Sequence, residues 1–441
     1  MIKYLNQLVI SICWIGSIGS TDLNNLLWAK THELNLQALT ELALQENPLI
    51  KASKVSLEIS KQKETQVGIL PNPTFKYTYF GESVETRVGP QEQKFSLEQR
   101  LPWPSKLSNQ NKVAIAKSAI ADAEIHKKST STVLKVRLLW ADIQHLKLAQ
   151  NTTLESISLL KIWLSQLQTS FESSQTPYHR LLKMQNQISQ IENDFKQRAR
   201  SIQNKLASLK AELNIPSQDS LKTDSPKALT SLSLSEGQLD INSATHHNHA
   251  VMMARNDKAL WQIQKSLNQS EYFPDFSIGF SYIQTGEANS PLVKDSGKDP
   301  WSVNLGLSLP IFFSQTKARQ KESELGRSRA QINMNSALNT FQNLKTQFMN
   351  DLHTEQENQI LYQTQILPNL SKSISLQTSM LSTGKINFLE LLDAYQMKLE
   401  YELKVQSTIK NQFKNKAKLL WLTGDIHPQF NFQFNTSTHK L

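Results

Sequence analysis

A helical pattern of apolar residues occurs twice in this chain, at an offset of 210 residues, and each copy follows a pair of strand-like segments. The two helical stripes share the steps 3, 4, 3 and 4, being Ile157, Leu160, Leu164, Leu167 and Phe171 in the first copy and Leu367, Leu370, Ile374, Gln377 and Leu381 in the second. Repetition on this scale predicts two similar lobes rather than one compact domain.

Each lobe contains two segments in which apolar and polar residues alternate, a pattern typical of a strand with one apolar face. We predict strands at 74–80 and 94–101 in the first lobe and at 275–283 and 301–309 in the second. Polar loops at 81–93 and 284–300 separate the two strands of each pair. Leu101-Pro102 and Leu309-Pro310 end the second strand of each pair.

Very long helices follow the strands. Residues 105–172 contain neither Pro nor Gly, and a helix of that length spans roughly 100 Å at 1.5 Å per residue. A break at 173–177 and a returning helix complete a predicted hairpin at 105–213. A second hairpin is predicted at 314–423, where only Gly326 and Pro368 interrupt the helix before the turn at Thr383-Gly384-Lys385.

The N-terminal residues 1–20 have the pattern of a secretory signal peptide, because an apolar run at 8–18 is too short to span a membrane as a helix. The single cysteine, Cys13, lies in that run. We divide the rest into an N-terminal segment at 21–35, a first repeat at 36–215, a connector at 216–235, a second repeat at 236–424 and a tail at 425–441.

Composition and charge exclude several classes of function. Mean hydropathy is −0.43, which excludes a bundle of membrane-spanning helices. The net charge of +10 is spread over the helices among acidic residues, so no nucleic-acid partner is expected. The sequence has no nucleophile elbow, phosphate-binding glycine loop or metalloprotease signature. We therefore expect neither an enzyme nor a bound cofactor.

The four strands have an apolar face rich in Phe, Tyr, Leu, Val and Ile and an opposite face of small or charged residues. The thinly apolar helices offer little cover for such a sheet, which favours a membrane barrel over a half-buried soluble sheet. Four strands are too few to close a barrel, and open edges do not occur in lipid. Three copies of the chain supply twelve strands, an even number typical of outer-membrane barrels.

Several motifs, in this order, resemble the outer membrane efflux channel family, the TolC-like proteins. They are Leu70-Pro71-Asn72-Pro73, Gln99-Arg100-Leu101-Pro102-Trp103-Pro104, Leu307-Ser308-Leu309-Pro310-Ile311, and Thr383-Gly384-Lys385 followed by Phe388-Leu389-Glu390-Leu391-Leu392-Asp393-Ala394-Tyr395-Gln396. The resemblance covers nearly the whole mature chain. Its Pro-Trp-Pro and Leu-Pro-Asn-Pro segments look most like the heavy-metal efflux branch.

The resemblance implies a mixed, predominantly α fold, with an internally duplicated, long antiparallel coiled-coil helical barrel and four β-strands per chain in a trimeric 12-stranded transmembrane β-barrel. It implies a homotrimer in the outer membrane of a Gram-negative bacterium, with a periplasmic tunnel that docks onto an adaptor protein and an inner-membrane pump. Members of the suspected branch often have a lipidated N-terminal cysteine, and Cys13 does not occupy that position.

Four charged residues are candidates for a pore gate. Glu390 and Asp393 are three residues apart and share a helix face, and the resemblance implies an aspartate constriction there. A ring of carboxylates at a constriction attracts cations. At the same place in the first repeat are Arg180 and Lys183, whose charges can pair with them. The alternative is an acidic surface near a helix start.

The two hairpin turns are the expected adaptor contacts, at Ser174, Gln175, Thr176 and Pro177 and at Thr383, Gly384 and Lys385. The alternative is that Gly384 only permits the tight turn, and both readings stay open. A third candidate is a metal site at His246, His247 and His249, because imidazole binds copper and other transition metals. Three solvated histidines are the alternative.

These features predict a passive conduit for metal cations or small toxic compounds. A type I secretion duct for polypeptides is an alternative with the same architecture. A soluble periplasmic coiled-coil scaffold without a pore is an alternative of another class.

Overall fold

The computed structural model describes residues 35–172, 177–223, 246–290, 292, 294–382 and 388–424. It is mostly helical, with one four-stranded antiparallel sheet, so the predicted mixed, predominantly α fold is confirmed. The chain divides into two units. One comprises Met1–Ala52, Ile125–His249 and Leu338–Leu441, and the other comprises Ser53–Glu124 and Ala250–Ala337.

Asparagine side chains begin the first two helices, α2 (Leu36–Glu46) and α3 (Pro48–Gln66). Asn35 Oδ1 accepts a hydrogen bond from the Ala38 amide at 2.9 Å. Asn47 Oδ1 accepts from the Leu49 amide, also at 2.9 Å, and Pro48 occupies the first helical position, where its missing N–H costs nothing.

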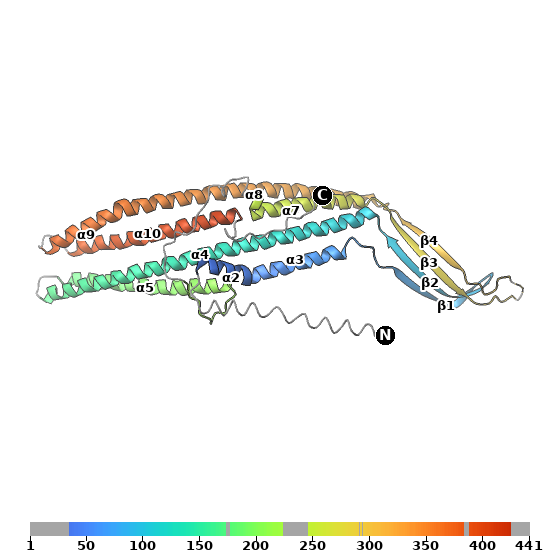
Figure 1. Ribbon diagram of the computed structural model, residues 1–441, viewed down its shortest axis with the longest axis horizontal. Helices are drawn as coiled ribbons and strands as arrows, with labels where there is room; N and C mark the ends of the chain where they lie inside the picture. Colours follow the sequence, from blue (N-terminus) through green and yellow to red (C-terminus); the bar gives the residue numbers. More distant parts are fainter. Residues whose placement is uncertain are drawn as a thin grey trace. The chain divides into compact units, whose positions relative to one another are not determined.

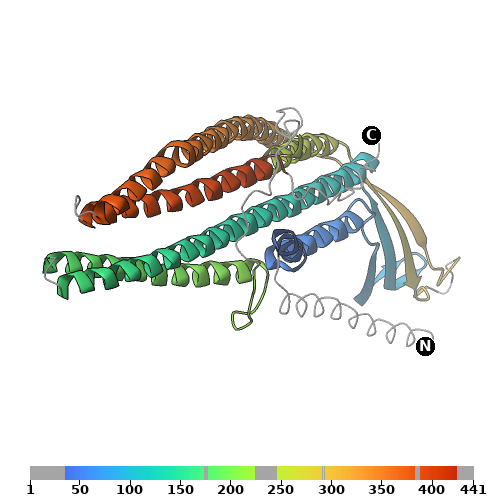
Figure 2. The same cartoon turned by 60° about the vertical axis from the view of Figure 1, so that its left-hand side comes forward.

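The first helical hairpin consists of α4 (Pro104–Glu172) and α5 (Tyr178–Glu212), and the second of α8 (Phe313–Leu361), a π-helical turn η2 (Tyr362–Ile366), α9 (Leu367–Ser382) and α10 (Phe388–Leu422). Within the first unit, α4 lies beside α5 and α9 beside α10 (Figures 1 and 2). The π-helical turn just precedes Pro368. Proline has no N–H for the Thr364 carbonyl, and the Leu367 amide bonds to the Tyr362 carbonyl instead.

The two larger apolar clusters of the first unit pack its helices together. One joins α2, α4, α5 and α10, where the Trp140 and Phe413 rings pack with centroids 5.4 Å apart. The other, which we call the hairpin cluster, comprises Ile157, Leu160, Leu167, Leu181, Met184, Ile188, Ile191, Phe388, Leu392 and Leu399. The hairpin cluster therefore packs the first hairpin against the start of α10.

The two copies of the helical stripe are not equally buried. Ile157, Leu160 and Leu167 are buried, whereas Leu367, Leu370 and Ile374 are only half-buried. Ile157, Leu160 and Leu167 of the first copy belong to the hairpin cluster.

The sheet lies in the second unit and has the order β1-β2-β3-β4. Its strands are β1 (Thr74–Thr86), β2 (Gly89–Leu101), β3 (Asp275–Thr285) and β4 (Trp301–Ser308), and helix α7 (His249–Ser270) precedes β3. Figure 1 shows the four strands side by side. The two halves of the repeat meet where β2 pairs with β3.

The predicted polar loop at 81–93 is wrong. Strand β1 continues to Thr86, which pairs with Gly89, so that only Arg87 and Val88 form the turn. The alternation of apolar and polar residues breaks in β1 where a bulge lies between Tyr79 and Val84. Gly89 has φ +132°, a conformation that side chains rarely adopt, and its use in the turn explains why a polar segment forms a hairpin here.

Candidate functional site: the amphipathic sheet and the ends of the helical hairpins

The register of the sheet gathers its apolar side chains on one face. One cross-strand row contains Phe75, Leu97, Phe280 and Val303, and the next contains Tyr77, Phe95, Tyr282 and Trp301. The described part of the chain leaves these side chains uncovered, since Phe75 is 64% exposed, Trp301 67% and Leu305 82%. The sheet therefore presents a continuous apolar surface that needs a non-aqueous environment.

The opposite face is lined by small and polar residues. One row contains Lys76, Ser96, Ser281 and Ser302, and another contains Thr74, Glu98, Gly279 and Asn304. Short hydrogen-bonded links cross this face, because Ser281 Oγ donates to Ser96 Oγ at 3.3 Å and Asn304 Nδ2 donates to Ser281 Oγ at 3.4 Å. The polar side chains make this face compatible with contact with water.

Both edges of the sheet are open within the described part of the chain. Strand β1 pairs only with β2, and β4 pairs only with β3. Unpaired edge amides and carbonyls are tolerated in lipid only when another strand completes the ladder.

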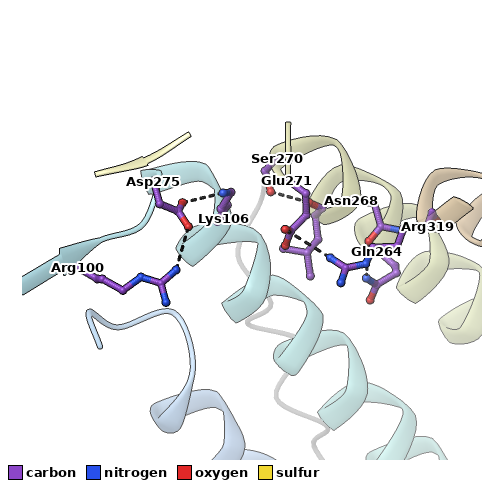
Figure 3. A network of polar contacts seen from close by, with 9 residues as sticks. Arg100, Lys106, Gln264, Asn268, Ser270, Glu271, Asp275 and Arg319 are labelled. Atoms are coloured by element: carbon purple, nitrogen blue, oxygen red, sulfur yellow. Dashed lines mark hydrogen bonds and ion pairs between the residues drawn. The ribbon is translucent and has the colours of Figure 1, made fainter. Parts of the chain in front are cut away.

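Asp275, at the start of β3, ties the sheet to the start of α4. Its carboxylate lies 2.7 Å from Lys106 Nζ and 3.6 Å from an Arg100 guanidinium nitrogen. The same carboxylate accepts a hydrogen bond from the Trp103 backbone amide at 3.2 Å. Figure 3 shows these side chains converging between β2, β3 and α4. Lys106 is only 10% exposed and Asp275 18%, so this junction is largely withdrawn from solvent.

Aromatic rings pack beside this junction. Trp103 stacks on Phe273 at a centroid distance of 5.1 Å and lies 6.1 Å from Phe276. Figure 3 also shows the adjoining contacts between α7 and α8, where Asn268 donates to the Arg319 carbonyl at 2.7 Å and Glu271 lies 3.5 Å from the Arg319 guanidinium. Ion pairs and aromatic stacking thus hold the end of the sheet where β3 begins.

At the other end of the long helices, one pair of the predicted gate residues is in contact. Lys183 Nζ on α5 lies 3.1 Å from Asp393 Oδ1 on α10. Glu390 is exposed in the first turn of α10, where a carboxylate is favoured by the helix dipole. Among the described residues, Lys183–Asp393 is the only ion pair that these four side chains form with one another.

Aromatic rings hold the ends of the hairpins. Trp163 on α4 packs edge-on against Phe388 at 6.0 Å and against Tyr395 at 5.2 Å. Phe171 and Tyr178, which flank the first turn, lie 5.6 Å apart. Of the predicted adaptor contacts, Pro177 precedes α5 as its N-cap, and Ser174, Gln175, Thr176, Thr383, Gly384 and Lys385 lie outside the described residues.

The three candidate metal-binding histidines do not converge. His246 and His247 are exposed, whereas His249 is 7% exposed and packs against the Trp421 ring at 5.0 Å. No group of three or more His, Cys, Asp or Glu side chains in the described ranges is arranged to hold a metal ion.

Sequence patterns did not reveal a polar network beside the apolar cluster that contains Trp140 and Phe413. The Asp142 carboxylate on α4 accepts from Lys205 Nζ on α5 at 2.9 Å and from Lys414 on α10. Burial alone would raise the pKa of Asp142, but hydrogen bonds and attraction from Lys414 and Lys205 outweigh it and lower the pKa. These partners lie far apart in the sequence, so no local motif indicates them.

Two further groups of this network have lowered pKa values. Burial, together with the charge of Lys410, lowers the pKa of His145 to about 4. Burial, together with repulsion from Lys414, lowers the pKa of Lys410. Both shifts disfavour additional positive charge inside the helical unit.

Within the described residues, no helix combines the length and apolar character that a transmembrane crossing requires.

A family model matches part of the second half of the chain. Residues 241–419 match the family described as outer membrane efflux protein. This family consists of channels rather than enzymes. No curated protein matches the sequence.

Solved structures share the fold across most of the chain. A membrane protein from Pseudomonas aeruginosa is 12% identical, with a TM-score of 0.77 over 90% of this chain and 91% of its own. The outer membrane protein VceC from Vibrio cholerae is 15% identical, with a TM-score of 0.74 over 88% and 96%. The open state of the Neisseria gonorrhoeae MtrE outer membrane channel is 16% identical, with a TM-score of 0.72 over 88% of both chains.

Proposed function

We propose that this chain, which has the fold of the TolC-like outer membrane channels and carries an outer membrane efflux protein domain at 241–419, forms the outer membrane conduit of an efflux system as a homotrimer. Each copy contributes four strands to one 12-stranded barrel, and the helical hairpins form a tunnel in the periplasm. The conduit is passive and carries metal cations or small toxic compounds outward.

The observation that carries this proposal is the sheet, which has one apolar face, one polar face and two open edges. Closure with the sheets of two sister chains pairs every edge, turns the apolar face to lipid and turns the polar face to a water-filled lumen. A soluble scaffold would leave side chains such as Leu305, which is 82% exposed, in water.

We further propose that the tip of the tunnel is a gate formed by Glu390, Asp393, Arg180 and Lys183. The Lys183–Asp393 pair joins the two hairpins of one chain, and its loss would free α10 to move. The neighbouring turns, including Pro177 and Gly384, are the proposed contacts for a periplasmic adaptor. Energy for transport comes from the inner-membrane pump that the adaptor joins to the channel.

Thiol labelling tests the orientation of the sheet. Asn304→Cys and Leu305→Cys, made in a Cys13→Ser background, place a thiol on opposite faces of β4 at adjacent positions. In intact outer membranes, a charged thiol reagent should modify Asn304→Cys and leave Leu305→Cys unmodified. Equal modification of both variants would contradict a lipid-facing apolar surface.

Ion selectivity tests the gate. In planar lipid bilayers, the double variant Glu390→Ala/Asp393→Ala should lose part of its cation preference relative to the parent channel, because carboxylates at a constriction attract cations. Glu58→Ala, which removes a carboxylate from the exposed Lys61–Glu58 pair on α3, is the control. Unchanged selectivity in the double variant would remove the gate assignment.

A further inference from the structure

Four helices of the second unit lie in a row, in the order α3-α4-α7-α8 (Figure 1). Three asparagines cross the contacts between neighbours. Asn111 joins α3 and α4, Asn109 joins α4 and α7, and Asn268 joins α7 and α8, each by donating to a backbone carbonyl, at 3.0, 3.2 and 2.7 Å. The strands to which these helices connect have the same order, β1-β2-β3-β4. The row therefore ends at α3 on one side and at α8 on the other, as the sheet ends at β1 and β4.

The end helix α3 has exposed apolar side chains on the face turned away from the row. Ser53 is buried and Leu57 is half-buried, which identifies the covered face. Val55 and Ile59 each follow one of these residues by two positions and so lie about 200° further round the helix. Both are 59% exposed, and residues four apart on a helix are neighbours. They form one patch, which we call the α3 stripe.

The other end helix, α8, has the same arrangement. Ser323 and Ala330 are buried, and Leu325 and Ile332 each follow one of them by two positions, on the far face. Leu325 is 59% exposed and Ile332 65%, and we call this pair the α8 stripe. Lys321 shares the face and is exposed, and its long stem can cover apolar surface while its ammonium group stays in water. Each end of the row thus has an apolar stripe that the described part of the chain leaves uncovered.

The two stripes lie at the same level relative to the sheet. Val55 is 11 residues before Gln66, where α3 ends towards β1, and Leu325 is 12 residues after Phe313, where α8 begins beyond β4. At 1.5 Å per residue, each lies about 17–18 Å from the sheet end of its helix. Because α3 runs towards the sheet and α8 runs away from it, the two helices are antiparallel.

Exposed apolar residues also connect each stripe with an open edge of the sheet. Ile69 and Leu70, between α3 and β1, are 63% and 50% exposed. Ile311 and Phe312, between β4 and α8, are 62% and 75% exposed. Each side of the second unit therefore has a continuous uncovered border, which consists of a strand edge, an apolar connection and a helix stripe. Borders of this extent mark surfaces that bind another protein or a membrane.

We propose that the α3 stripe of one copy of the chain packs against the α8 stripe of the next copy, so that Val55 lies at the level of Leu325. The inference rests on the trimer proposed above and assigns its helical interface to these residues. The occupant is a second copy because the two borders differ, lie at matching levels and are continuous with strand edges that need another copy to pair. Contacts between two different surfaces of one chain close into a ring.

The stripes of a single chain cannot satisfy each other. Two helices, α4 and α7, lie between α3 and α8, and packed helices are about 8–10 Å apart. Three such steps separate the end helices. Any direct contact between the two stripes therefore joins different copies, and a covalent link between them reports on assembly.

Disulfide cross-linking in outer membranes tests the contact. In a Cys13→Ser background, Val55→Cys is combined in one chain with Leu325→Cys. Oxidation should link the chains into covalent dimers and trimers, because a disulfide forms where two Cα atoms come within about 7 Å. Two further variants replace Leu325→Cys by Lys321→Cys or Ser328→Cys, which lie about one turn to either side and allow for a shift along the helices.

A matched pair controls for random collision. Ile115 is 49% exposed but lies on α4, inside the row. Ile115→Cys combined with Leu325→Cys should therefore leave the chains unlinked. If none of the three Val55→Cys pairs yields covalent dimers or trimers, in protein that still migrates as a heat-modifiable trimer, the helical contact is wrong and the conduit stands. Protein that remains a single chain in the membrane would overturn the trimeric conduit, and this inference with it.

Thermal dissociation of the trimer tests the same contact without covalent chemistry. Val55→Ser/Leu325→Ser removes apolar surface from both stripes and should lower the dissociation temperature on gels by several degrees, because the buried contact loses its hydrophobic contribution. Ile115→Ser, which removes a similarly exposed side chain from α4, should dissociate as the parent does. A double variant that dissociates at the parental temperature would contradict the packing of the two stripes.

Discussion

Lys183 and Asp393, whose Nζ and Oδ1 atoms lie 3.1 Å apart, occupy equivalent positions in the two repeats and are separated by 210 residues, the repeat offset. The duplicated hairpins thus contact each other through matching positions that have acquired opposite charges. The hairpin cluster, which includes Leu181 and Leu392, packs beside this pair. The opposite charges at these equivalent positions therefore link helix α5 of the first repeat to helix α10 of the second.

Reversal of the Asp393 charge alone should loosen the proposed gate without unfolding the chain. Both side chains are about half exposed, 46% for Lys183 and 59% for Asp393, so the pair contributes no more than about 1 kcal/mol to stability. Asp393→Lys should increase the channel conductance, because two lysines then repel each other at the junction of α5 and α10. The swapped variant Lys183→Asp/Asp393→Lys should restore the parental conductance. An unaltered conductance in Asp393→Lys would show that the pair does not hold the tip.

Removal of the Asp275 carboxylate should weaken the junction between sheet and helix. Asp275→Ala leaves Lys106, which is only 10% exposed, without its partner, and we expect a loss of about 1–3 kcal/mol of stability. Glu98→Ala is the matched control, since its pair with Lys76 is exposed and should contribute less than about 1 kcal/mol. Trimer dissociation by heat, followed on gels, measures both. Equal dissociation temperatures for the two variants would contradict the role of Asp275.

The stability of the helical unit should fall as the pH decreases from 6.5 to about 4. Folding lowers the pKa of His145 from 6.5 to about 4, so the unfolded chain binds a proton over this interval while the folded chain does not. The loss should be at most about 2 kcal/mol, because His145 is partly screened by solvent. Below this range, protonation of Asp142, whose pKa is also lowered, removes further stability.

His145→Gln isolates the contribution of the histidine. Circular dichroism melts of the variant should show a much smaller change between pH 6.5 and pH 4 than melts of the parent, while both lose stability below pH 4. The same pH dependence in both proteins would indicate that His145 does not titrate in this interval.

A side chain at position 326 should disrupt the packing between α7 and α8. A Cβ atom there would lie 2.3 Å from the Trp261 ring, and overpacking of this kind costs about 1–3 kcal/mol. Gly326→Ala should therefore lower the melting temperature of the protein. At Gly81 no atom lies within 4 Å of an added Cβ, so Gly81→Ala should melt as the parent does. A Gly326→Ala variant as stable as Gly81→Ala would refute the close contact.

Much of the fold follows from local patterns in the sequence. The long helix α4 follows from the absence of Pro and Gly, and the faces of β3 and β4 follow from strict alternation. The hairpin at Arg87 and Val88 could not be predicted in this way, because a bulge breaks the alternation and polar residues extend both strands. Bulges and tight turns depend on backbone conformations that hydrophobicity does not encode.

The candidate site was only partly accessible to sequence reasoning. The repeat offset predicted that Lys183 and Asp393 can pair, because equivalent residues of two packed, duplicated hairpins lie at the same level along the helices. The Asp275 junction and the Asp142 network join side chains from three separate elements each, and no spacing within one segment indicates such contacts. His249 shows the converse, because it is close in sequence to His246 and His247 but forms no metal-binding group with them in the described residues.

The mass of the particle in detergent solution, corrected for bound detergent, tests the central claim most directly. An open four-stranded sheet with an uncovered apolar face should exist only as part of a closed assembly, so we predict a particle of three chains that precipitates when detergent is withdrawn. A stable single chain in detergent-free buffer would contradict the account.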